Sequence, residues 1–336
     1  MTSSVQTSYA IHDIHVCVRG KPDWATQAVA DLLSAYRVPA APGRTPDVIF
    51  ELQRAASSTP PRRAGDAPLF VYEPMWATAD GDTIRLSDGH SQLWVHARGR
   101  RIDACVHEQS ARDIHQFGAL LCGVALQICL RHHGLYYTHA AALISDSGRT
   151  VLLTGNSGEG KSTLSMALAL AGWRFVSDDA VYLRRGSDRL LAFRRPVHLD
   201  GSTLALLPEL RRLARGPHRR AGRIRWDLDP AEAFGNDTLH DIASGAALLV
   251  VLNTGASAAQ TGVQPLTSQQ ALPHLLRQGG LVMLGGPPAQ NHLDALTRLA
   301  REGPNLQLTL GPGLLGRPRK AASALRQAEV ALAGSP

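Results

Sequence analysis

The amino-acid sequence predicts a mixed α/β fold, in which a strand-rich N-terminal region precedes an α/β core. Three observations carry this prediction. Residues 135–310 alternate short apolar runs with helical patterns, which is typical of a sheet covered by helices. Residues 83–86 and 92–96 alternate apolar and polar side chains about a Ser-Asp-Gly-His turn, as a β-hairpin does. A glycine-rich loop at 155–162 separates an apolar run from a helical pattern.

The N-terminal region contains several predicted strands and no recognisable chemistry. Besides the hairpin, we expect strands at 69–72 and 101–106, and a loop at 56–67 that is rich in Ser, Pro, Arg and Gly. The histidines of residues 1–112 have no metal-ligand spacing, so we expect them to be structural or to lie on the surface.

A helix is predicted at 113–132, because Ile114, Phe117 and Leu121 recur at helical spacing and Gly134 follows as a stop signal. In the core that follows, we expect strands at 140–144, 150–154, 174–177, 181–183, 190–193 and 246–252, and helices at 161–171 and 268–278. The predicted division is a strand-rich region of unknown role at 1–112, a domain with its leading helix at 113–312, and a C-terminal tail at 313–336. We expect this tail to be a loose helix or a frayed end.

Composition limits the function classes. The chain has 336 residues, 44% of them hydrophobic, and a formal net charge of +7, so it can bury a sizeable core and favours anionic partners such as nucleotides. It has no zinc spacing or RNA-binding signature, so a nucleic-acid partner is not expected. Residues 117–130 are too short for a membrane span. The four cysteines form no CxxC pair and no secretory signal is recognised, which predicts a reduced, cytoplasmic protein.

The strongest motif is the phosphate-binding loop. It fits the pattern G-x-x-x-x-G-K-[ST] without a mismatch, and its residues are Gly155, Asn156, Ser157, Gly158, Glu159, Gly160, Lys161 and Ser162, with Thr163 next in the helix. Glycines let backbone amides converge on phosphate oxygens, and a helix N-terminus adds partial positive charge. Lys161 is expected to neutralise the β- and γ-phosphates and Ser162 to bind Mg²⁺. A glycine turn that precedes a helix by chance is the alternative.

A pair of carboxylates follows the loop closely. Only sixteen residues separate Lys161 from Asp178, and Asp178 and Asp179 come directly after the strand at 174–177. In a βαβ unit this short the second strand is expected to lie parallel to the first, with both carboxyl ends at the ligand-binding edge. One aspartate can hold Mg²⁺ and the other can accept a proton from an attacking hydroxyl. The alternative is that the pair merely caps a turn.

The assembled motifs resemble a known family. His139-Ala-Ala-Ala, the loop Gly155–Ser162 followed by Thr163-Leu164, and Gly172-Trp-Arg-Phe-Val-Ser-Asp-Asp-Ala-Val181 are similar to the C-terminal catalytic domain of HPr serine kinase/phosphorylase, and most similar to HPr-kinase-related proteins of the lasso-peptide tailoring type. The match is specific over about 137–185, and 195–199 and 263–267 look like later landmarks of that family.

The resemblance implies a P-loop kinase core of the HPr kinase/phosphoenolpyruvate carboxykinase type that uses ATP and Mg²⁺. It implies a serine hydroxyl of a peptide or protein as acceptor, such as a ribosomally made peptide precursor. Asp178 is implied as the base, His139 lies beside the aspartates, and Asp179 and Ser162 are near Mg²⁺. Family analogy also allows a homo-oligomer.

Two departures from the family narrow this expectation. Thr163 stands where the family loop often has Glu, and the glycine-rich segment of the bifunctional enzyme is not found. A plain kinase is therefore expected, rather than one that phosphorylates HPr and reverses the reaction. Two other functions stay open: a nucleotide-dependent binding or assembly protein, which needs no base, and a kinase of small-molecule hydroxyls.

The segment 211–225 holds seven arginines and His218. One interpretation is a solvated loop. The other is a mobile lid or substrate clamp, whose guanidinium groups would pair with ATP phosphates or with acidic groups of the acceptor.

Overall fold

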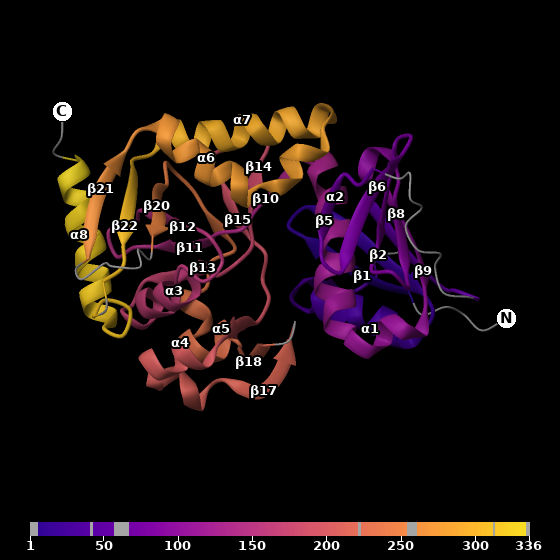
Figure 1. Ribbon diagram of the computed structural model, residues 1–336, viewed down its shortest axis with the longest axis horizontal. Helices are drawn as coiled ribbons and strands as arrows, with labels where there is room; N and C mark the ends of the chain where they lie inside the picture. The colour runs from indigo at the N-terminus through magenta and orange to yellow at the C-terminus, as the bar shows by residue number, and fades with distance from the viewer. Residues whose placement is uncertain are drawn as a thin grey trace. The chain divides into compact units, whose positions relative to one another are not determined.

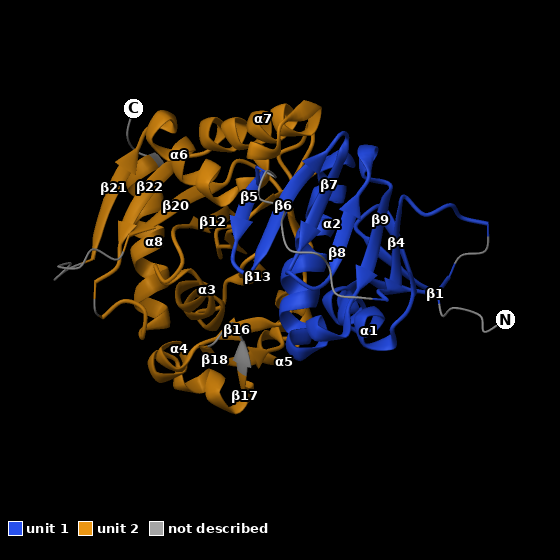
Figure 2. Cartoon of the chain, turned by 45° about the vertical axis from the view of Figure 1, so that its right-hand side comes forward, with its two compact units in different colours: residues 1–134 blue, residues 135–336 orange. Residues whose placement is uncertain are grey.

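The computed structural model describes residues 6–40, 43–56, 67–220, 223–253, 261–311 and 313–333, whose strands form four sheets (Figure 1). The chain divides into two units, residues 1–134 and residues 135–336, which are coloured separately in Figure 2. Each unit is described by itself. The structure is of the mixed α/β class that the sequence predicts.

Unit 1 is built on a nine-stranded sheet with the order β3-β1-β2-β4-β9-β8-β7-β6-β5. Its elements are β1 (Gln6–Ile11), β2 (Ile14–Gly20), α1 (Asp23–Leu32), β3 (Arg37–Val38), β4 (Val48–Arg54), β5 (Phe70–Tyr72), β6 (Met75–Asp80), β7 (Thr83–Ser87), β8 (Gln92–Val95) and β9 (Arg101–Val106). The expected strands appear as β5, β7, β8 and β9, with β7 and β8 paired as the predicted hairpin. The predicted loop at 56–67 lies mostly outside the described residues.

The prediction of one α-helix at 113–132 is wrong for the first half of this segment. A short 3-10 segment (Glu108–Asp113) leads to a π-helix (Gln116–Cys122), and α2 (Gly123–His132) follows. The wide turn coincides with a close approach to α1, because a Cβ on Gly118 would lie 2.9 Å from the carbonyl oxygen of Ala28. Ile114, expected on the buried face, is exposed. Since the units divide at Gly134, α2 falls in unit 1 and not in the α/β unit.

The central sheet of unit 2 has six strands in the order β13-β11-β12-β20-β22-β21. The strands are β11 (Ala141–Ile144), β12 (Thr150–Thr154), β13 (Arg174–Ser177), β20 (Leu248–Asn253), β21 (Gly262–Leu266) and β22 (Asn305–Thr309). The strands β12, β20 and β22 run parallel, whereas β11 is antiparallel to both β12 and β13. The carboxyl ends of β12 and β13 and the start of β11 therefore meet at one edge.

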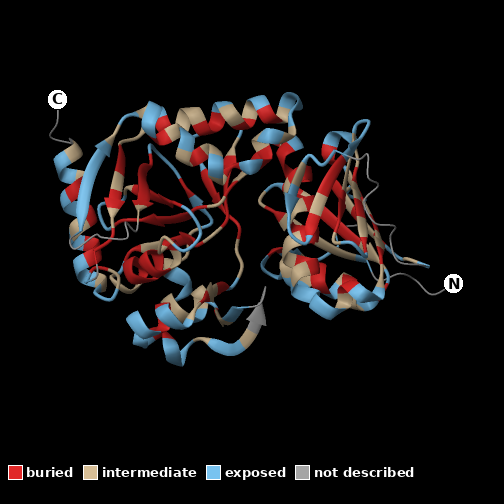
Figure 3. Ribbon diagram, in the orientation of Figure 1, coloured by how far each residue is buried: buried red, intermediate tan, exposed pale blue. Residues whose placement is uncertain are grey.

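Helices cover both faces of this sheet (Figure 1). The helices α3 (Lys161–Leu170) and α8 (Pro318–Ala333) pack on one face, where Leu153, Leu164 and Leu325 share a core cluster. The helices α6 (Ser268–Gln278) and α7 (Gly286–Glu302) pack on the other, where Leu152 contacts a second cluster. All residues of β12 are buried, which accounts for its continuous apolar run (Figure 3).

Two smaller sheets complete unit 2. The first contains β10 (Leu135–Thr138), β14 (Val181–Arg184), β15 (Leu190–Ala192) and β19 (Ile242–Ala243), and β14 and β15 form the hairpin expected at 181–193. The second has the order β16-β18-β17, with β16 (Val197–Leu199), β17 (Arg215–Arg220) and β18 (Arg223–Leu228). Two short helices, α4 (Gly201–Leu206) and α5 (Pro230–Phe234), flank this sheet in the chain.

The C-terminal segment is helical, which is one of the two forms expected, but it is packed into the core and is not loose. Residues 318–333 form α8, and Ala321, Ala322 and Leu325 are buried in the core shared with α3. Its alanines made the segment look featureless, but small side chains let a helix approach its neighbour closely. Across the described ranges, none of the helices has the length and apolar character needed to span a membrane.

Candidate active site

The sequence-predicted site residues come together at one edge of the central sheet. The loop 155–162, which the sequence predicts to bind phosphate, follows β12; Asp178 and Asp179 follow β13, and His139 precedes β11. The strand β11 lies between β12 and β13, so β13 is parallel to β12 without being its neighbour. Because β11 is antiparallel, its first residues lie at the same edge as the ends of the other two.

The loop has a conformation that only glycine adopts readily. Gly158 and Gly160 have φ values of 89° and 83°, in the left-handed region. The helix α3 starts at Lys161 with Gly160 as its N-cap, and no side chain caps it. Its first backbone N–H groups are therefore left for another acceptor, which is the arrangement that binds anions at helix N-termini.

A carboxylate of the chain already lies in the loop. The backbone N–H of Asn156 donates to Glu159 Oε2, and Asn156 Nδ2 donates to Glu159 Oε1 at 2.9 Å. A Cβ added to Gly155 would lie 2.6 Å from that same Oε2, so the glycine makes room for the carboxylate. The loop thus accepts a negatively charged group at a backbone amide.

Lys161 lies almost wholly buried at the base of the loop. Its Nζ donates to the carbonyl oxygens of Gly155 at 2.7 Å and Asn156 at 3.1 Å. Burial lowers the pKa of Lys161, while the charges of Asp178 and Glu159 act in the opposite direction. An anion in the loop would favour the charged ammonium group for the same reason.

Asp178 is also buried and sits against α3. Ser165 donates its hydroxyl to Asp178 Oδ1 at 2.6 Å, and the Ser162 hydroxyl also hydrogen-bonds to this carboxylate. Burial raises the pKa of Asp178, and these hydroxyls, with the charges of Arg195 and His139, partly offset the effect. A hydroxyl and a carboxylate side by side can share a divalent cation, and a carboxylate with a raised pKa can also take up a proton near neutral pH.

Asp179 is held by two basic side chains. His139 Nδ1 lies 2.6 Å from Asp179 Oδ1, and Arg195 forms an ion pair with Asp179 Oδ2. Burial lowers the pKa of His139 to about 4, helped by the charges of Lys161 and Arg195, so the ring is neutral at pH 7. With Nδ1–H donating to Asp179, the lone pair is on Nε2. The backbone N–H of His139 is fixed by the carbonyl of Gln278 at the end of α6.

Other predicted site residues lie differently. Asn156, Ser157 and Gly158 are exposed at the tip of the loop. Thr163, predicted to bind nucleotide, is buried, and its hydroxyl is 2.8 Å from that of Thr203 in α4. In the arginine-rich segment, Arg211 and Arg212 end a 3-10 turn, whereas residues 215–220 and 223–225 lie in β17 and β18. Residues 221–222 lie outside the described residues.

Two residues of the cluster had no role in the sequence-based prediction. Ser165 lies four residues after Lys161, on the same face of α3, so helical spacing could have identified it. Arg195 was recognised only as part of a family landmark. It follows β15, and no spacing rule relates it to Asp179.

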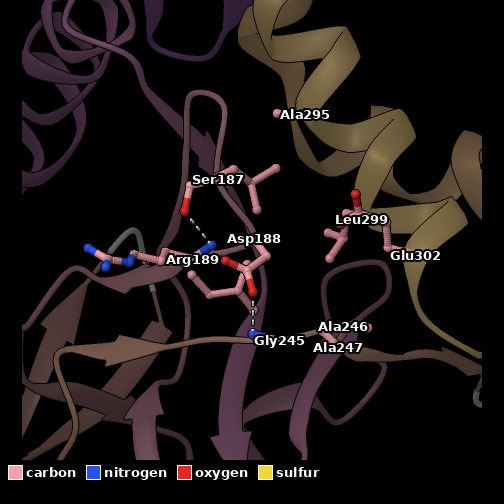
Figure 4. Close-up of a pocket in the computed structure, with 11 residues that line it drawn as sticks. Ser187, Asp188, Arg189, Gly245, Ala246, Ala247, Ala295, Leu299 and Glu302 are labelled. Atoms are coloured by element: carbon pink, nitrogen blue, oxygen red, sulfur yellow. Dashed lines mark hydrogen bonds between the residues drawn. The ribbon is translucent and has the colours of Figure 1, made fainter.

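A pocket of unit 2 lies away from these residues (Figure 4). Gly245 and Ala247 line it and precede β20, so it borders the amino ends of the parallel strands, opposite the phosphate-binding loop. Its polar groups serve the backbone, since Asp188 Oδ2 accepts the N–H of Gly245 at 2.8 Å and Ser187 Oγ accepts that of Arg189 at 3.1 Å. No predicted site residue lines this pocket.

Comparison with known proteins finds similarity among solved structures. No family model and no curated protein matches the chain. Among solved structures, it is similar to the HPr(Ser) kinase/phosphatase from Coxiella burnetii, at 17% identity over 59% of this chain and 99% of that one, with a TM-score of 0.29. Membership of the HPr kinase family therefore stays a prediction from the sequence motifs.

Proposed function

We propose that this chain is an ATP-dependent kinase with a P-loop core of the HPr kinase/phosphoenolpyruvate carboxykinase type. It transfers the γ-phosphoryl group of ATP to a hydroxyl, which we propose is that of a serine in a peptide or protein. The observation that carries the proposal is the convergence of Lys161, Asp178 and the His139–Asp179 pair beside an uncapped helix N-terminus. A fold that only bound nucleotide would need no buried carboxylate and neutral histidine there.

The loop residues are proposed to bind the phosphates. The Asn156 amide, which now binds a carboxylate, and the uncapped N–H groups of α3 would donate to phosphate oxygens. Lys161 would exchange its two carbonyl acceptors for β- and γ-phosphate oxygens. For Lys161 the exchange replaces neutral carbonyl acceptors by charged phosphate oxygens, which strengthens the hydrogen bonds.

The residues beside the loop fit a magnesium ion. Mg²⁺ prefers oxygen ligands and is commonly held by one or two carboxylates, a P-loop hydroxyl and the nucleotide phosphates. Ser162 supplies such a hydroxyl, and Asp178, which contacts it, and the adjacent Asp179 are the two candidate carboxylates. When bound, Mg²⁺ would neutralise charge on the β- and γ-phosphates.

Two divisions of roles between the aspartates remain. The raised pKa of Asp178 favours this residue as the base that accepts the proton of the acceptor hydroxyl. Its contact with Ser162 favours it as the metal ligand instead, with Asp179 then acting as base, held by His139 and Arg195. We propose the first division, with Asp179 and Ser162 near the metal.

The function is tested by phosphotransfer with purified protein. The chain, ATP and Mg²⁺ are incubated with the peptide products of neighbouring genes, and mass spectrometry locates any added phosphate. We expect a phosphoserine in one peptide, and no product with Asp178→Asn, because the amide cannot take up a proton. General-base contributions are typically about 10²–10⁴-fold in rate.

Binding of ATP-Mg²⁺ to the same variant decides between the two divisions. Retained binding with lost transfer supports Asp178 as base, whereas loss of binding makes Asp178 the metal ligand. If Asp178→Asn and Asp179→Asn both keep full function in the native assay, the chain is a nucleotide-dependent binding protein. If the protein phosphorylates a small hydroxyl compound and no peptide, the kinase activity stands and only the proposed peptide or protein acceptor is wrong.

A further inference from the structure

A second cluster of ligand-forming side chains lies on the three-stranded sheet of unit 2. It consists of His198 on β16, His218 on β17 and Asp227 on β18, all partly buried. Sequence separations of nine to twenty residues hid it, since these are not the short spacings of zinc motifs. None of the three belongs to the phosphate-binding site.

The strand register puts the three side chains on one face. His198 is the direct partner of Asp227 across the β16–β18 pair, and opposed residues share a face. On the other side of β18, His218 opposes Arg225, two residues from Asp227 and so on the same face. Between Arg215 and His218 the register shifts, and such a bulge redirects the side chains beside it.

The potential ligand atoms are close together. His198 Nδ1 lies 2.6 Å from Asp227 Oδ1, and His218 Nε2 lies 3.5 Å from the same oxygen. All three atoms lie within 4.8 Å of one another. Ligands about 2.0–2.2 Å from a tetrahedral zinc ion lie roughly 3.3–3.6 Å apart. The His218–Asp227 distance already fits this range, and the His198–Asp227 contact must open by about 1 Å or less.

The neighbouring arginines do not exclude a cation from this face. Arg225 Nη1 lies 3.1 Å from Asp200 Oδ2, and Arg215 is paired with Glu232. Arg215 and Arg225 are the arginines that face the cluster across the β17–β18 pair. Each of them forms an ion pair with a carboxylate that is not part of the cluster. Asp227 is the anionic member of the cluster, beside two imidazoles.

We propose that His198, His218 and Asp227 form a binding site for a divalent transition-metal ion, with Zn²⁺ as the ion that suits them best. Two imidazole nitrogens and one carboxylate oxygen are the ligands that zinc takes in sites with an open fourth position, which water would fill. On binding, the ion would lie between His198 Nδ1 and Asp227, and the neutral ring would carry its single proton on Nε2. The ion would join β16, β17 and β18, and would fix β16 three residues after Arg195.

Calorimetric titration of tag-free, chelator-treated protein with Zn²⁺ tests the site. Excess Mg²⁺ is present throughout, so that oxygen-rich sites do not compete. We expect one equivalent of Zn²⁺ to bind, and His198→Ala, His218→Ala or Asp227→Asn each to weaken it at least about 100-fold, since even outer-shell partners are worth 10–100-fold. His90→Ala, an exposed histidine of unit 1, is the matched control and keeps full binding.

Two further measurements keep the outcomes distinct. Metal-free variants should unfold at the same temperature as metal-free wild type, which separates a lost ligand from a lost fold. His139→Gln should bind Zn²⁺ as wild type does, and if it does not, the ion occupies the proposed phosphate site. That result would overturn the proposal, as would stoichiometric binding unaffected by all three substitutions, or no binding by the wild type.

Discussion

At the level of single residues, burial shifts the pKa values of the groups beside the loop 155–162. It lowers the pKa of Lys161 and of His139, and it raises the pKa of Asp178. Each shift favours the uncharged form, as desolvation does. All three residues could be singled out from the sequence, because each belongs to a recognisable sequence motif. It could not predict these shifts, because they depend on which strands and helices exclude water from the edge of the sheet.

Lys161→Ala should weaken ATP binding. The substitution removes the only side-chain ammonium group in the loop, and hydrogen bonds to charged groups are worth about 1.5–3 kcal/mol, so the affinity should fall at least about tenfold. Calorimetry measures the affinity. Lys320→Ala removes an exposed lysine in α8 and is the matched control. Equal ATP affinity in both variants and the wild type would contradict the phosphate-binding role.

Asp178→Asn should leave the fold as stable as wild type, or more stable, at neutral pH. Because the folded-state pKa of Asp178 lies above its unfolded value, the folded chain holds this proton to higher pH. Its contribution to stability is present below the unfolded pKa and is lost as the pH rises through the folded pKa. The asparagine removes this dependence.

Unfolding midpoints at pH 7 and near pH 4 measure the effect. We expect the difference between wild type and Asp178→Asn to be larger at pH 7. A variant markedly less stable than wild type at pH 7 would mean that the charged carboxylate stabilises the fold, against the direction of its pKa shift.

At the level of elements, hydrophobic periodicity located β11 to β15, β20, α3 and α6 of unit 2, but not α7 or the strands β10, β16 to β19, β21 and β22. The helix at 268–278 was predicted with its observed bounds, and its Thr267–Gln270 capping box is formed. The segment 113–132 shows the limit, because apolar spacing does not distinguish an α-helix from the π-helix at 116–122. The helix α8 shows another limit, since an alanine-rich sequence does not reveal which face of the helix packs against the core.

Leu325→Ala should destabilise the protein strongly, because Leu325 is 1% exposed in the core between α8 and α3. Truncating a buried leucine typically costs about 2–5 kcal/mol. Val330→Ala in the same helix is the control, since Val330 is 72% exposed and surface changes stay within about 0.5 kcal/mol. Denaturant unfolding compares the two. Similar small losses would indicate that the end of the chain is the loose tail first expected.

At the level of the whole molecule, strand order was the main property that the sequence left open. The short connection between Lys161 and Asp178 predicted that β13 lies parallel to β12, but not that β11 comes between them. The strand β11 precedes β12 in the chain and pairs with β13, about thirty residues later in the sequence. Local sequence patterns do not reveal such a pairing. That insertion brings His139 to Asp179, which adjacency along the chain alone could not show.

Unit 2 contains every residue of the candidate active site. We therefore expect residues 135–336, produced alone, to fold and to bind ATP with an affinity close to that of the full chain, because the two core clusters of the central sheet are formed within this unit. Circular dichroism and calorimetry test this. A folded fragment without ATP affinity would show that the N-terminal unit is required for the nucleotide site.

The carboxylate of Glu159 has a consequence for the rate of ligand exchange. Since it accepts the Asn156 amide from within the loop, any incoming anion must first displace an internal competitor. The backbone of the loop 155–162 is therefore ordered before a ligand binds. Binding of an anion then consists of the exchange of the Glu159 carboxylate for that anion. Glu159→Gln removes the charge of the resident group and should speed association in stopped-flow measurements. The Glu159 carboxylate thus occupies the anion position of the loop and holds the loop backbone in the conformation that an incoming anion would meet.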